Sequence, residues 1–299
     1  MERKIDFKTI RLGENTGHGN ARRTSLANCS YSLVALMDAD DICEKNRFEL
    51  QLKAFASDNS LSIVGGQITE FIGDPANITG VRRVPEKNGE ILEYMKKRCP
   101  MNQVSVMFRK EEVEKAGGYI DWYCEEDYYL WIRMAETRCV FSNLPEILVN
   151  VRTGKEMASR RGGWKYFCSE RKLQRYMLKK KIIGFWRYLY NVAVRFGGEI
   201  VAPDSLRQKL FSLLRSKPAN ISLSNDTSPI VSKKKENDLP AFSVSMCVYS
   251  GDNPEWFDTA LLSVVEQTVL PDEIVLVIDG PIGEGLESVI EKYRDLCGG

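Results

Sequence analysis

The chain is 299 residues long, and its 42 Lys and Arg residues balance its 41 Asp and Glu residues, for a net charge of +1. This balance excludes a strongly basic nucleic-acid-binding protein and an acidic disordered tail, so we expect no nucleic-acid partner. Apolar residues make up 43% of the sequence, enough for a sizeable core, whereas neither a membrane-spanning run nor an N-terminal signal peptide is recognisable, which predicts a cytoplasmic location.

Apolar runs alternate with helical patterns through the first half of the chain. The sequence predicts strands over 5–12, 32–37, 61–71 and 103–109, helices over 47–55, 90–97 and 125–136, and an extended segment over 140–151. This alternation is typical of an α/β fold with a mostly parallel sheet flanked by helices.

Residues 164–215 differ in character and predict a basic, amphipathic helical extension. Eight basic residues and no acidic residue occur from Arg171 to Arg195, and apolar residues such as Trp186 and Tyr190 are interleaved with them. Two interpretations stay open: a helical pair packed on the core with a solvated basic face, or a peripheral contact with an anionic membrane at its inner face. Residues 216–241, rich in Ser, Asn, Lys and Pro, predict a flexible linker.

After the linker the pattern predicts one βαβ unit over 242–299. Its expected elements are a strand over 242–249, a helix over 254–269 and a strand over 273–278. Such a unit is of the nucleotide-binding type. Because a lone unit of this size cannot bury both faces of its strands, we expect it to pack on the rest of the chain or on another molecule.

The cysteines and histidine exclude several kinds of site. Eight cysteines are scattered without a CxxC pair, and His18 is the single histidine. A structural zinc site needs clustered ligands, and a Ser-His-Asp or Cys-His enzyme needs a partnered histidine. We therefore expect reduced, mostly buried thiols.

Three carboxylates, Asp38, Asp40 and Asp41, directly follow an apolar strand. Ligands of open α/β sheets bind outside the carboxyl ends of the strands, and clustered carboxylates there are unfavourable unless something neutralises them. A divalent cation that bridges to a diphosphate would do so. An acidic loop that caps the next helix is the alternative interpretation.

Two further segments carry weaker signals. The glycine-rich stretch 13–23 could approach an anion at a helix start, or could form an ordinary turn. In the helix expected over 125–136, Leu130, Trp131 and Met134 share one buried face, which would hold Asp127 at the helix start, where it could take a proton from a hydroxyl. Simple capping by acids is the alternative.

Together these segments resemble the family-2 glycosyltransferases of the GT-A fold, particularly those that build bacterial polysaccharides and the amylovoran-type branch. The motifs that carry the resemblance cover nearly all of the chain outside the linker. They are Cys247-Val248-Tyr249-Ser250, Asp279, Asn15 and Gly17 with Ala21-Arg22, Asp38 and Asp40, Gly117-Gly118-Tyr119, Glu126 and Asp127 with Leu130 and Arg133, and Arg160-Arg161-Gly162-Gly163. Arg23 departs from the asparagine usual in the family.

The order of the segments also departs from the family, which has the 242–299 unit ahead of residues 1–163. The chain therefore looks circularly permuted: 1–163 and 242–299 would complete one GT-A domain, and 164–215 would be the family's C-terminal helical extension placed mid-chain. Such a rearrangement is tolerated when the break falls in a surface loop. A fragment of two tandem transferase modules, whose halves complement each other between chains, is the rival explanation.

The resemblance implies a metal-dependent, inverting transfer of a sugar from a nucleotide sugar, expected to be UDP-linked, to a hydroxyl of a glycan or lipid-linked glycan. It assigns Tyr249, Asp279, Asn15, Arg22 and Asp38 to the nucleotide. It assigns Asp40 and Asp38 to Mn²⁺ or Mg²⁺, Asp127 to the role of catalytic base, and Glu126, Trp122, Arg160 and Arg161 to the acceptor or diphosphate.

Alternatives remain for individual residues and for the whole chain. Trp122 could instead pack in the core, and the Arg160 and Arg161 pair could be surface charge. The chain could be a non-catalytic nucleotide-sugar-binding or scaffold module, although its intact carboxylate motifs argue against that. A nucleotidyltransferase would more typically carry a basic, glycine-rich loop after its first strand, where this chain has Ser250-Gly251-Asp252-Asn253.

Overall fold

The sheet that the sequence predicts is present, and it joins both ends of the chain. A computed structural model describes residues 4–154, 163–201 and 239–298; Arg160, Arg161 and most of the expected linker lie outside these residues. The strands are β1 (Asp6–Arg11), β2 (Leu33–Asp38), β3 (Ile42–Cys43), β4 (Leu61–Phe71), β5 (Ile78–Arg82), β6 (Met107–Arg109), β7 (Val140–Arg152), β8 (Phe242–Val248) and β9 (Glu273–Ile278). They form one nine-stranded sheet in the order β1-β9-β8-β2-β6-β4-β7-β3, with β5 paired to β4.

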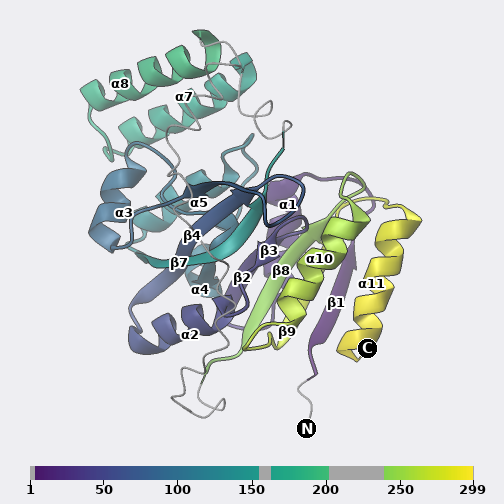
Figure 1. Cartoon of the computed structure of the whole chain (residues 1–299). Coiled ribbons are helices and arrows are strands. Elements are labelled where there is room, and N and C mark those ends of the chain that lie inside the picture. The colour runs from purple at the N-terminus through teal and green to yellow at the C-terminus, as the bar shows by residue number, and fades with distance from the viewer. Residues whose placement is uncertain (1–3, 155–162, 202–238, 299) are drawn as a thin grey trace.

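Helices cover the sheet on both faces (Figure 1). They are α1 (His18–Asn28), α2 (Arg47–Ser57), α3 (Asn88–Met95), α4 (Lys110–Lys115), α5 (Glu126–Glu136), α7 (Gly163–Lys179), α8 (Phe185–Phe196), α10 (Pro254–Val265) and α11 (Glu284–Cys297). None of the helices within the described ranges combines the length and apolarity that crossing a bilayer requires.

The two tail strands lie inside the sheet. Strands β9 and β8 are inserted between β1 and β2, and all four run parallel. The βαβ unit thus covers its faces by packing on the first half of the same chain, as its size requires. The remaining strands are mixed: β7 is parallel to β4, whereas β6 is antiparallel to both β2 and β4.

The strand expected over 103–109 is only partly correct. Residues Gln103–Ser105 form a 3₁₀ turn, and β6 begins at Met107. The Ser105 hydroxyl donates to the carbonyl oxygen of Asn102 at 2.7 Å, and the Asn102 amide donates to the carbonyl oxygen of Gly66 at 2.8 Å. These side-chain to backbone bonds satisfy groups that a strand would otherwise use in its ladder.

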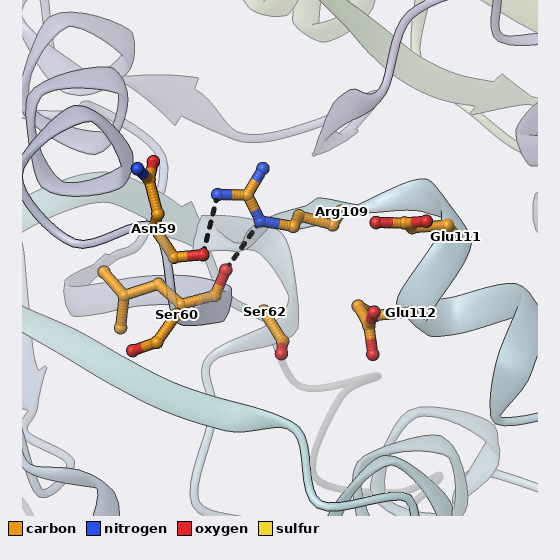
Figure 2. Close-up of a pocket in the computed structure, with 7 residues that line it drawn as sticks. Asn59, Ser60, Ser62, Arg109, Glu111 and Glu112 are labelled. Carbon is orange, nitrogen blue, oxygen red and sulfur yellow. Dashed lines mark hydrogen bonds between the residues drawn. The ribbon is translucent and has the colours of Figure 1, made fainter.

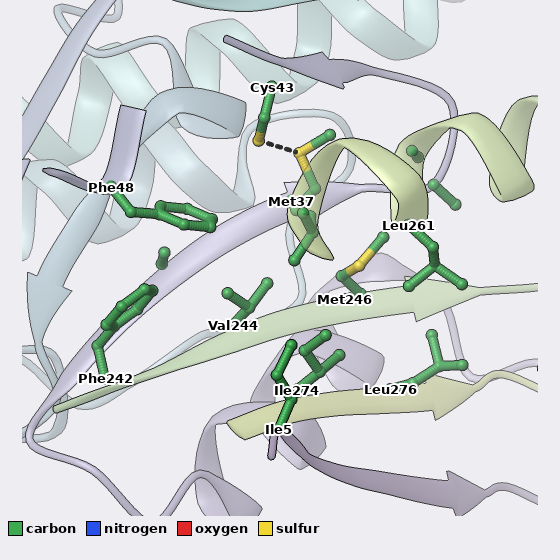
Figure 3. Packing of buried hydrophobic residues seen from close by; sticks show 14 of the residues in the cluster. Ile5, Met37, Cys43, Phe48, Phe242, Val244, Met246, Leu261, Ile274 and Leu276 are labelled. Atoms are coloured by element: carbon green, nitrogen blue, oxygen red, sulfur yellow. Dashed lines mark hydrogen bonds between the residues drawn. The ribbon is translucent and has the colours of Figure 1, made fainter. Parts of the chain in front are cut away.

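The two larger apolar cores of the described residues lie on the two faces of the sheet, beside a small third cluster around Ile68 and Leu148. One packs β8 and β9 under α2, α10 and α11, with the Phe48 and Phe242 rings edge to face at 5.0 Å (Figure 3). The other includes Leu26 of α1, Trp131 of α5 and Leu173 of α7. The predicted buried face of α5 is confirmed, because Leu130, Trp131 and Met134 are fully buried. All eight cysteines are unpaired, and four of them are buried.

A buried carboxylate ties the two ends of the chain together at the start of the strands. Glu273, at the start of β9, accepts hydrogen bonds from Lys8 of β1, from Ser243 of β8 and from the backbone and hydroxyl of Ser30, both at 2.8 Å. Burial alone would raise its pKa, but the hydrogen bonds from Lys8, Ser243 and Ser30 lower the pKa below its usual value. Glu273 is therefore held as an anion that joins three strands.

Candidate functional site

The motif residues gather at the carboxyl edge of the parallel strands. Asp38, the last residue of β2, lies opposite Cys247 of β8, and Val248 lies opposite Ile278 of β9. The turn at 38–41, the turn at 249–252 and Asp279 therefore follow three adjacent strands at one edge. Ligands of open α/β sheets bind at this edge.

Asp279 anchors the glycine-rich loop that precedes α1. Its two oxygens accept hydrogen bonds from the Thr16 backbone at 2.7 Å, the Thr16 hydroxyl at 2.9 Å and the Gly17 backbone at 3.1 Å. Gly280 follows with a φ of 89°, and a Cβ there would lie 2.8 Å from the backbone nitrogen of Asn15. The tail thus makes a close backbone contact with the head at the predicted nucleotide residues.

Arg22 connects two carboxylates of the predicted site. One guanidinium nitrogen donates to Asp38 at 2.9 Å and another to Glu126 at 3.2 Å. Burial opposes the charge of Arg22, but Asp38 and Glu126 outweigh it and raise the pKa of the guanidinium. The buried Arg22 therefore fixes the start of α5 against the end of β2, and it partly neutralises both carboxylates.

Asp127 lies at the first turn of α5, where the sequence predicts it. One of its oxygens accepts from the Tyr128 backbone at 2.6 Å, and the other lies 3.9 Å from the Cys99 sulfur. Its side chain is half-buried. The neighbouring Glu126 has a raised pKa because of burial and then the charge of Asp127, with Arg22 opposing the shift. The start of α5 thus presents clustered carboxylates beside the end of β2.

A buried polar network behind Asp127 was not predicted. Glu125 accepts a hydrogen bond from the Tyr166 hydroxyl at 3.0 Å, and the same hydroxyl lies 3.4 Å from Glu170, which forms an ion pair with Arg195. Burial raises the pKa of Glu125 well above its usual value, and the charges of Glu170 and Asp127 raise it further. This network joins the start of α5 to both α7 and α8.

Arg152 is another residue that the sequence analysis missed. Its guanidinium lies between two rings, 4.7 Å from the Phe71 centroid and 4.6 Å from that of Trp256 on α10. It donates to the carbonyl oxygen of Asp40 at 3.2 Å, while its backbone nitrogen donates to the Asp41 carboxylate at 2.9 Å. Arg152 therefore holds the 38–41 turn against β4 and the tail segment, and the only sequence signal was an arginine at the end of an extended run.

Trp122 packs against its neighbours. Its ring lies 4.4 Å from the Tyr129 ring, and the Lys172 amino group lies 4.2 Å from its centroid. These contacts favour the packing interpretation of Trp122 over a sugar-stacking surface.

The carboxylates at this edge suit a shared cation better than a protein-only metal site. Across residues 4–154, 163–201 and 239–298, no group of three or more His, Cys, Asp or Glu side chains is arranged to hold a metal ion. Mg²⁺, however, is commonly bound by one or two carboxylates together with substrate phosphates. Asp38 and Asp40 fit that partial role, and their charges raise the pKa of a third carboxylate, Asp252.

Asp252 reports the negative potential of this edge. It accepts a hydrogen bond from the Tyr249 backbone at 2.9 Å. Its pKa is raised to about 7, mainly by burial and then by the charges of Asp40 and Asp38, against the opposing effect of the backbone hydrogen bond. Besides the cost of burial, Asp252 is therefore repelled by Asp40 and Asp38, and a cation would relieve that repulsion.

A hollow of about 320 Å³ lies elsewhere, lined by Asn59, Ser60, Ser62, Arg109 and two glutamates (Figure 2). Arg109 pairs with Leu33 at the start of β2, so the hollow is at the end of that strand opposite to Asp38. Arg109 is already fixed there by donation to the carbonyl oxygens of Leu61 at 2.9 Å and Asn59 at 3.3 Å. The hollow is therefore separate from the candidate site.

Comparison with known proteins gives consistent results. Residues 1–113 match the family model described as glycosyl transferase family 2. An uncharacterized glycosyltransferase of Haemophilus influenzae is 40% identical over 212 residues, which cover 71% of this chain and 78% of that protein.

Two relatives have more specific names. A UDP-Gal:alpha-D-GlcNAc-diphosphoundecaprenol beta-1,3-galactosyltransferase of Escherichia coli is 34% identical over 209 residues, covering 70% of this chain and 75% of that protein. An amylovoran biosynthesis glycosyltransferase of Erwinia amylovora is 36% identical over 178 residues, covering 60% of this chain and 66% of that protein.

The raised pKa of Asp252 predicts a pH-dependent stability. When folding raises the pKa of a carboxyl group, its stabilising contribution is fully present at pH values below the pKa of the unfolded chain, near 4. This contribution is lost as the pH rises through the pKa of the folded protein, about 7. We expect Asp252→Asn to melt ~2–4 °C higher than the wild type at pH 8, after allowance for solvent screening, with a smaller difference at pH 5.

Thermal melting by circular dichroism across this range measures the difference, with Asp295→Asn on the exposed surface of α11 as the control. A difference in melting temperature that stays constant from pH 5 to pH 8 would contradict the assignment.

Proposed function

Given that the chain belongs to the family-2 glycosyltransferases of bacterial polysaccharide synthesis, we propose that it moves a sugar with inversion from a UDP-linked donor to a glycan hydroxyl, with Mn²⁺ or Mg²⁺ as cofactor. The observation that carries the proposal is the common edge at which Arg22 joins Asp38 to Glu126, the neighbour of Asp127, while Asp279 holds the loop before α1. The name of the Escherichia coli relative, which includes UDP-Gal, supports the choice of UDP.

The nucleotide would lie across the junction of head and tail. Tyr249 and Asp279 come from the tail, and Asn15, Arg22 and Asp38 come from the head. Asp279 already accepts backbone hydrogen bonds at this junction, and a carboxylate keeps further lone pairs for the donors of a base or a ribose. The half-buried Tyr249 ring packs over Gly251 beside this edge.

Asp40, with Asp38, would hold the cation. A divalent cation bound there would stabilise the negative charge that develops on the leaving diphosphate. The protein's own contribution is to fix the turn that bears the two carboxylates, which Arg152 does through the carbonyl oxygen of Asp40 and the carboxylate of Asp41.

Asp127 would act as the base. It would accept the proton of the acceptor hydroxyl while that oxygen forms a bond to the anomeric carbon, and the bond to the diphosphate would break on the opposite side, which inverts the configuration. Its half-buried position at a helix start held by Arg22 and by the Glu125 network supports this role. Glu126 would hold the Arg22 guanidinium at the start of α5 through their hydrogen bond. Arg160 and Arg161 remain predicted contacts of the diphosphate.

The acceptor is proposed to be a lipid-linked glycan. The name of the Escherichia coli relative includes a diphosphoundecaprenol acceptor. An acceptor of this kind lies at a membrane surface, and the basic segment 171–195 is proposed to hold the chain there.

We also propose that the chain is circularly permuted with respect to its family. The support is the position of β8 and β9 between β1 and β2, together with the contact between Gly298 and Lys4, where a Cβ on Gly298 would lie 3.0 Å from the lysine nitrogen. The two segments therefore lie within the reach of one lysine side chain.

Asp127→Asn tests the base. We expect a ~10²–10⁴-fold loss of transfer rate, the usual contribution of general base catalysis, with UDP affinity unchanged within about twofold. Transfer measured by UDP release and binding measured by calorimetry separate the two, and Glu136→Gln at the other end of α5 is the control. Transfer at the wild-type rate would refute the role of Asp127 as the base. A loss of UDP affinity as large as the loss of transfer rate would instead assign Asp127 to donor binding.

Asp40→Ala tests the cation. We expect Mn²⁺-dependent UDP affinity to fall at least ~10-fold while the affinity measured without metal stays unchanged, because only the bridged contact is lost. Calorimetric titration with and without Mn²⁺ measures both, with Asp74→Ala in an exposed turn as the control. Unchanged affinity in Mn²⁺ would count against the assignment.

A reordered chain tests the permutation. We expect a reordered chain, with residues 239–299 moved directly ahead of residue 1, to be a monomer. Its melting temperature should lie within a few degrees of that of the original chain, and it should transfer sugar at a similar rate. Light scattering and activity over a dilution series measure this. The contrary result is an original chain that is active only as a dimer and loses its activity on dilution, while the reordered monomer stays active. That result would refute the permutation and show that two chains complement each other.

A further inference from the structure

Helix α8 has its polar side turned inward. Its one fully buried residue is Asn191, whose amide donates to Gln174 of α7 and to the carbonyl oxygen of Lys96, both at 2.8 Å. Arg195, one turn later, pairs with Glu170 and donates to the carbonyl oxygen of Lys97 at 3.0 Å. These polar contacts hold the helix to the protein, together with the partly buried Tyr188 and the Phe196 ring, which lies 5.5 Å from the Phe167 ring of α7.

The opposite side of α8 is apolar and exposed. Trp186 is 80% exposed and Tyr190 is 63% exposed. The large apolar residues exposed on this helix are Phe185, Trp186, Leu189, Tyr190, Val194 and Phe196. Trp186, Tyr190 and Val194 follow at intervals of four, so they line one face. A surface helix of a globular protein normally shows the reverse arrangement, and contiguous exposed apolar patches mark interaction sites.

Positive charge lies beside this face. Helix α7 and the turn before α8 carry the exposed basic residues Arg171, Lys172, Arg175, Lys179, Lys180 and Lys181, of which Lys172 lies over the Trp122 ring and Lys180 pairs with Glu136. No acidic residue occurs between Arg171 and Arg195. Figure 1 shows α7 and α8 side by side at one end of the molecule. Aromatic side chains on one face of a helix and clustered cations beside it are what an anionic lipid interface attracts.

We propose that the outer face of α8 inserts into the surface of an anionic bilayer, with the basic residues of α7 and of the 179–181 turn on the lipid head groups. A second copy of the chain would bring like charges together, whereas an anionic bilayer complements both the apolar face and its basic surroundings. The proposal deepens the proposed function, since it names the surface on which a lipid-linked acceptor would be met.

The docking face is connected to the catalytic helix. The Ser169 hydroxyl of α7 donates to the carbonyl oxygen of Tyr123 at 2.7 Å, and Tyr166 bonds to Glu125 at the start of α5. Arg195 of α8 reaches the same network through Glu170. A bilayer bound at α8 would therefore be held at a fixed distance from Asp127.

Vesicle binding by the full chain tests the face without donor or acceptor. We expect sedimentation with vesicles of phosphatidylglycerol and phosphatidylcholine, and at least ~10-fold weaker partitioning of the double variant Trp186→Ser/Tyr190→Ser, since it removes two interfacial aromatic anchors. The matched control is Ile72→Ser/Leu296→Ser, which replaces exposed apolar residues elsewhere. Melting temperatures of all variants check that each is folded.

The charge component has its own variant. Lys179→Gln/Lys181→Gln should weaken binding to anionic vesicles and reduce its salt dependence, and vesicles of phosphatidylcholine alone should bind the wild type weakly. Equal binding of the Trp186→Ser/Tyr190→Ser variant and the wild type would overturn the proposal. A dimer that this variant dissociates, with no vesicle binding by the wild type, would overturn it in favour of self-association.

Transfer to a water-soluble acceptor separates this proposal from the proposed function. The Trp186→Ser/Tyr190→Ser variant should keep its rate on such an acceptor, because both side chains lie on the exposed face of α8, whereas Arg195, which reaches the Glu125 network, is left unchanged. Absent transfer by the wild type, together with intact vesicle binding, would refute the function and leave the docking face standing.

Discussion

The parallel pairing of β9 with β1 and of β8 with β2 is the constraint on which the candidate site depends. It places the ends of strands from opposite ends of the chain at one edge, so Asp38 lies opposite Cys247 while Asp279 follows Ile278. A slip of one residue in either pairing would turn alternate side chains to the other face of the sheet. The buried Glu273 at the amino end and Gly280 at the carboxyl end fix the register from both sides.

Charge at this edge is only partly balanced. Arg22 pairs with Asp38 and Glu126, and Arg152 binds the 38–41 turn, yet the pKa of Asp252 remains raised to about 7. Removing such a carboxylate, or pairing it with a cation, would increase the stability of the fold. The cation proposed above would offset this remaining charge.

Local patterns predicted the elements of the fold, and long-range contacts decided the parts that they did not predict. The apolar runs of β2, β4 and β9 and the buried face of α5 are visible in the sequence because their periodicity is local. The bridge from Arg22 to Glu126 spans 104 positions, and the stacking of Arg152 on Trp256 joins head and tail. Such contacts exist only after the sheet has formed. The 3₁₀ turn at 103–105 was missed because hydrogen bonds from Asn102 and Ser105 override an apolar run.

Helix α8 marks the limit of hydrophobic patterning as a guide to burial. The sequence shows an amphipathic helix, and the usual interpretation would turn Trp186 and Tyr190 toward the core. The structure buries Asn191 instead, because its amide has two partners and the partly buried Arg195 has Glu170 beside it. With the inner side fixed by these contacts, Trp186 and Tyr190 face outward. An outward apolar face is unfavourable in water, and the bilayer contact proposed above would bury it.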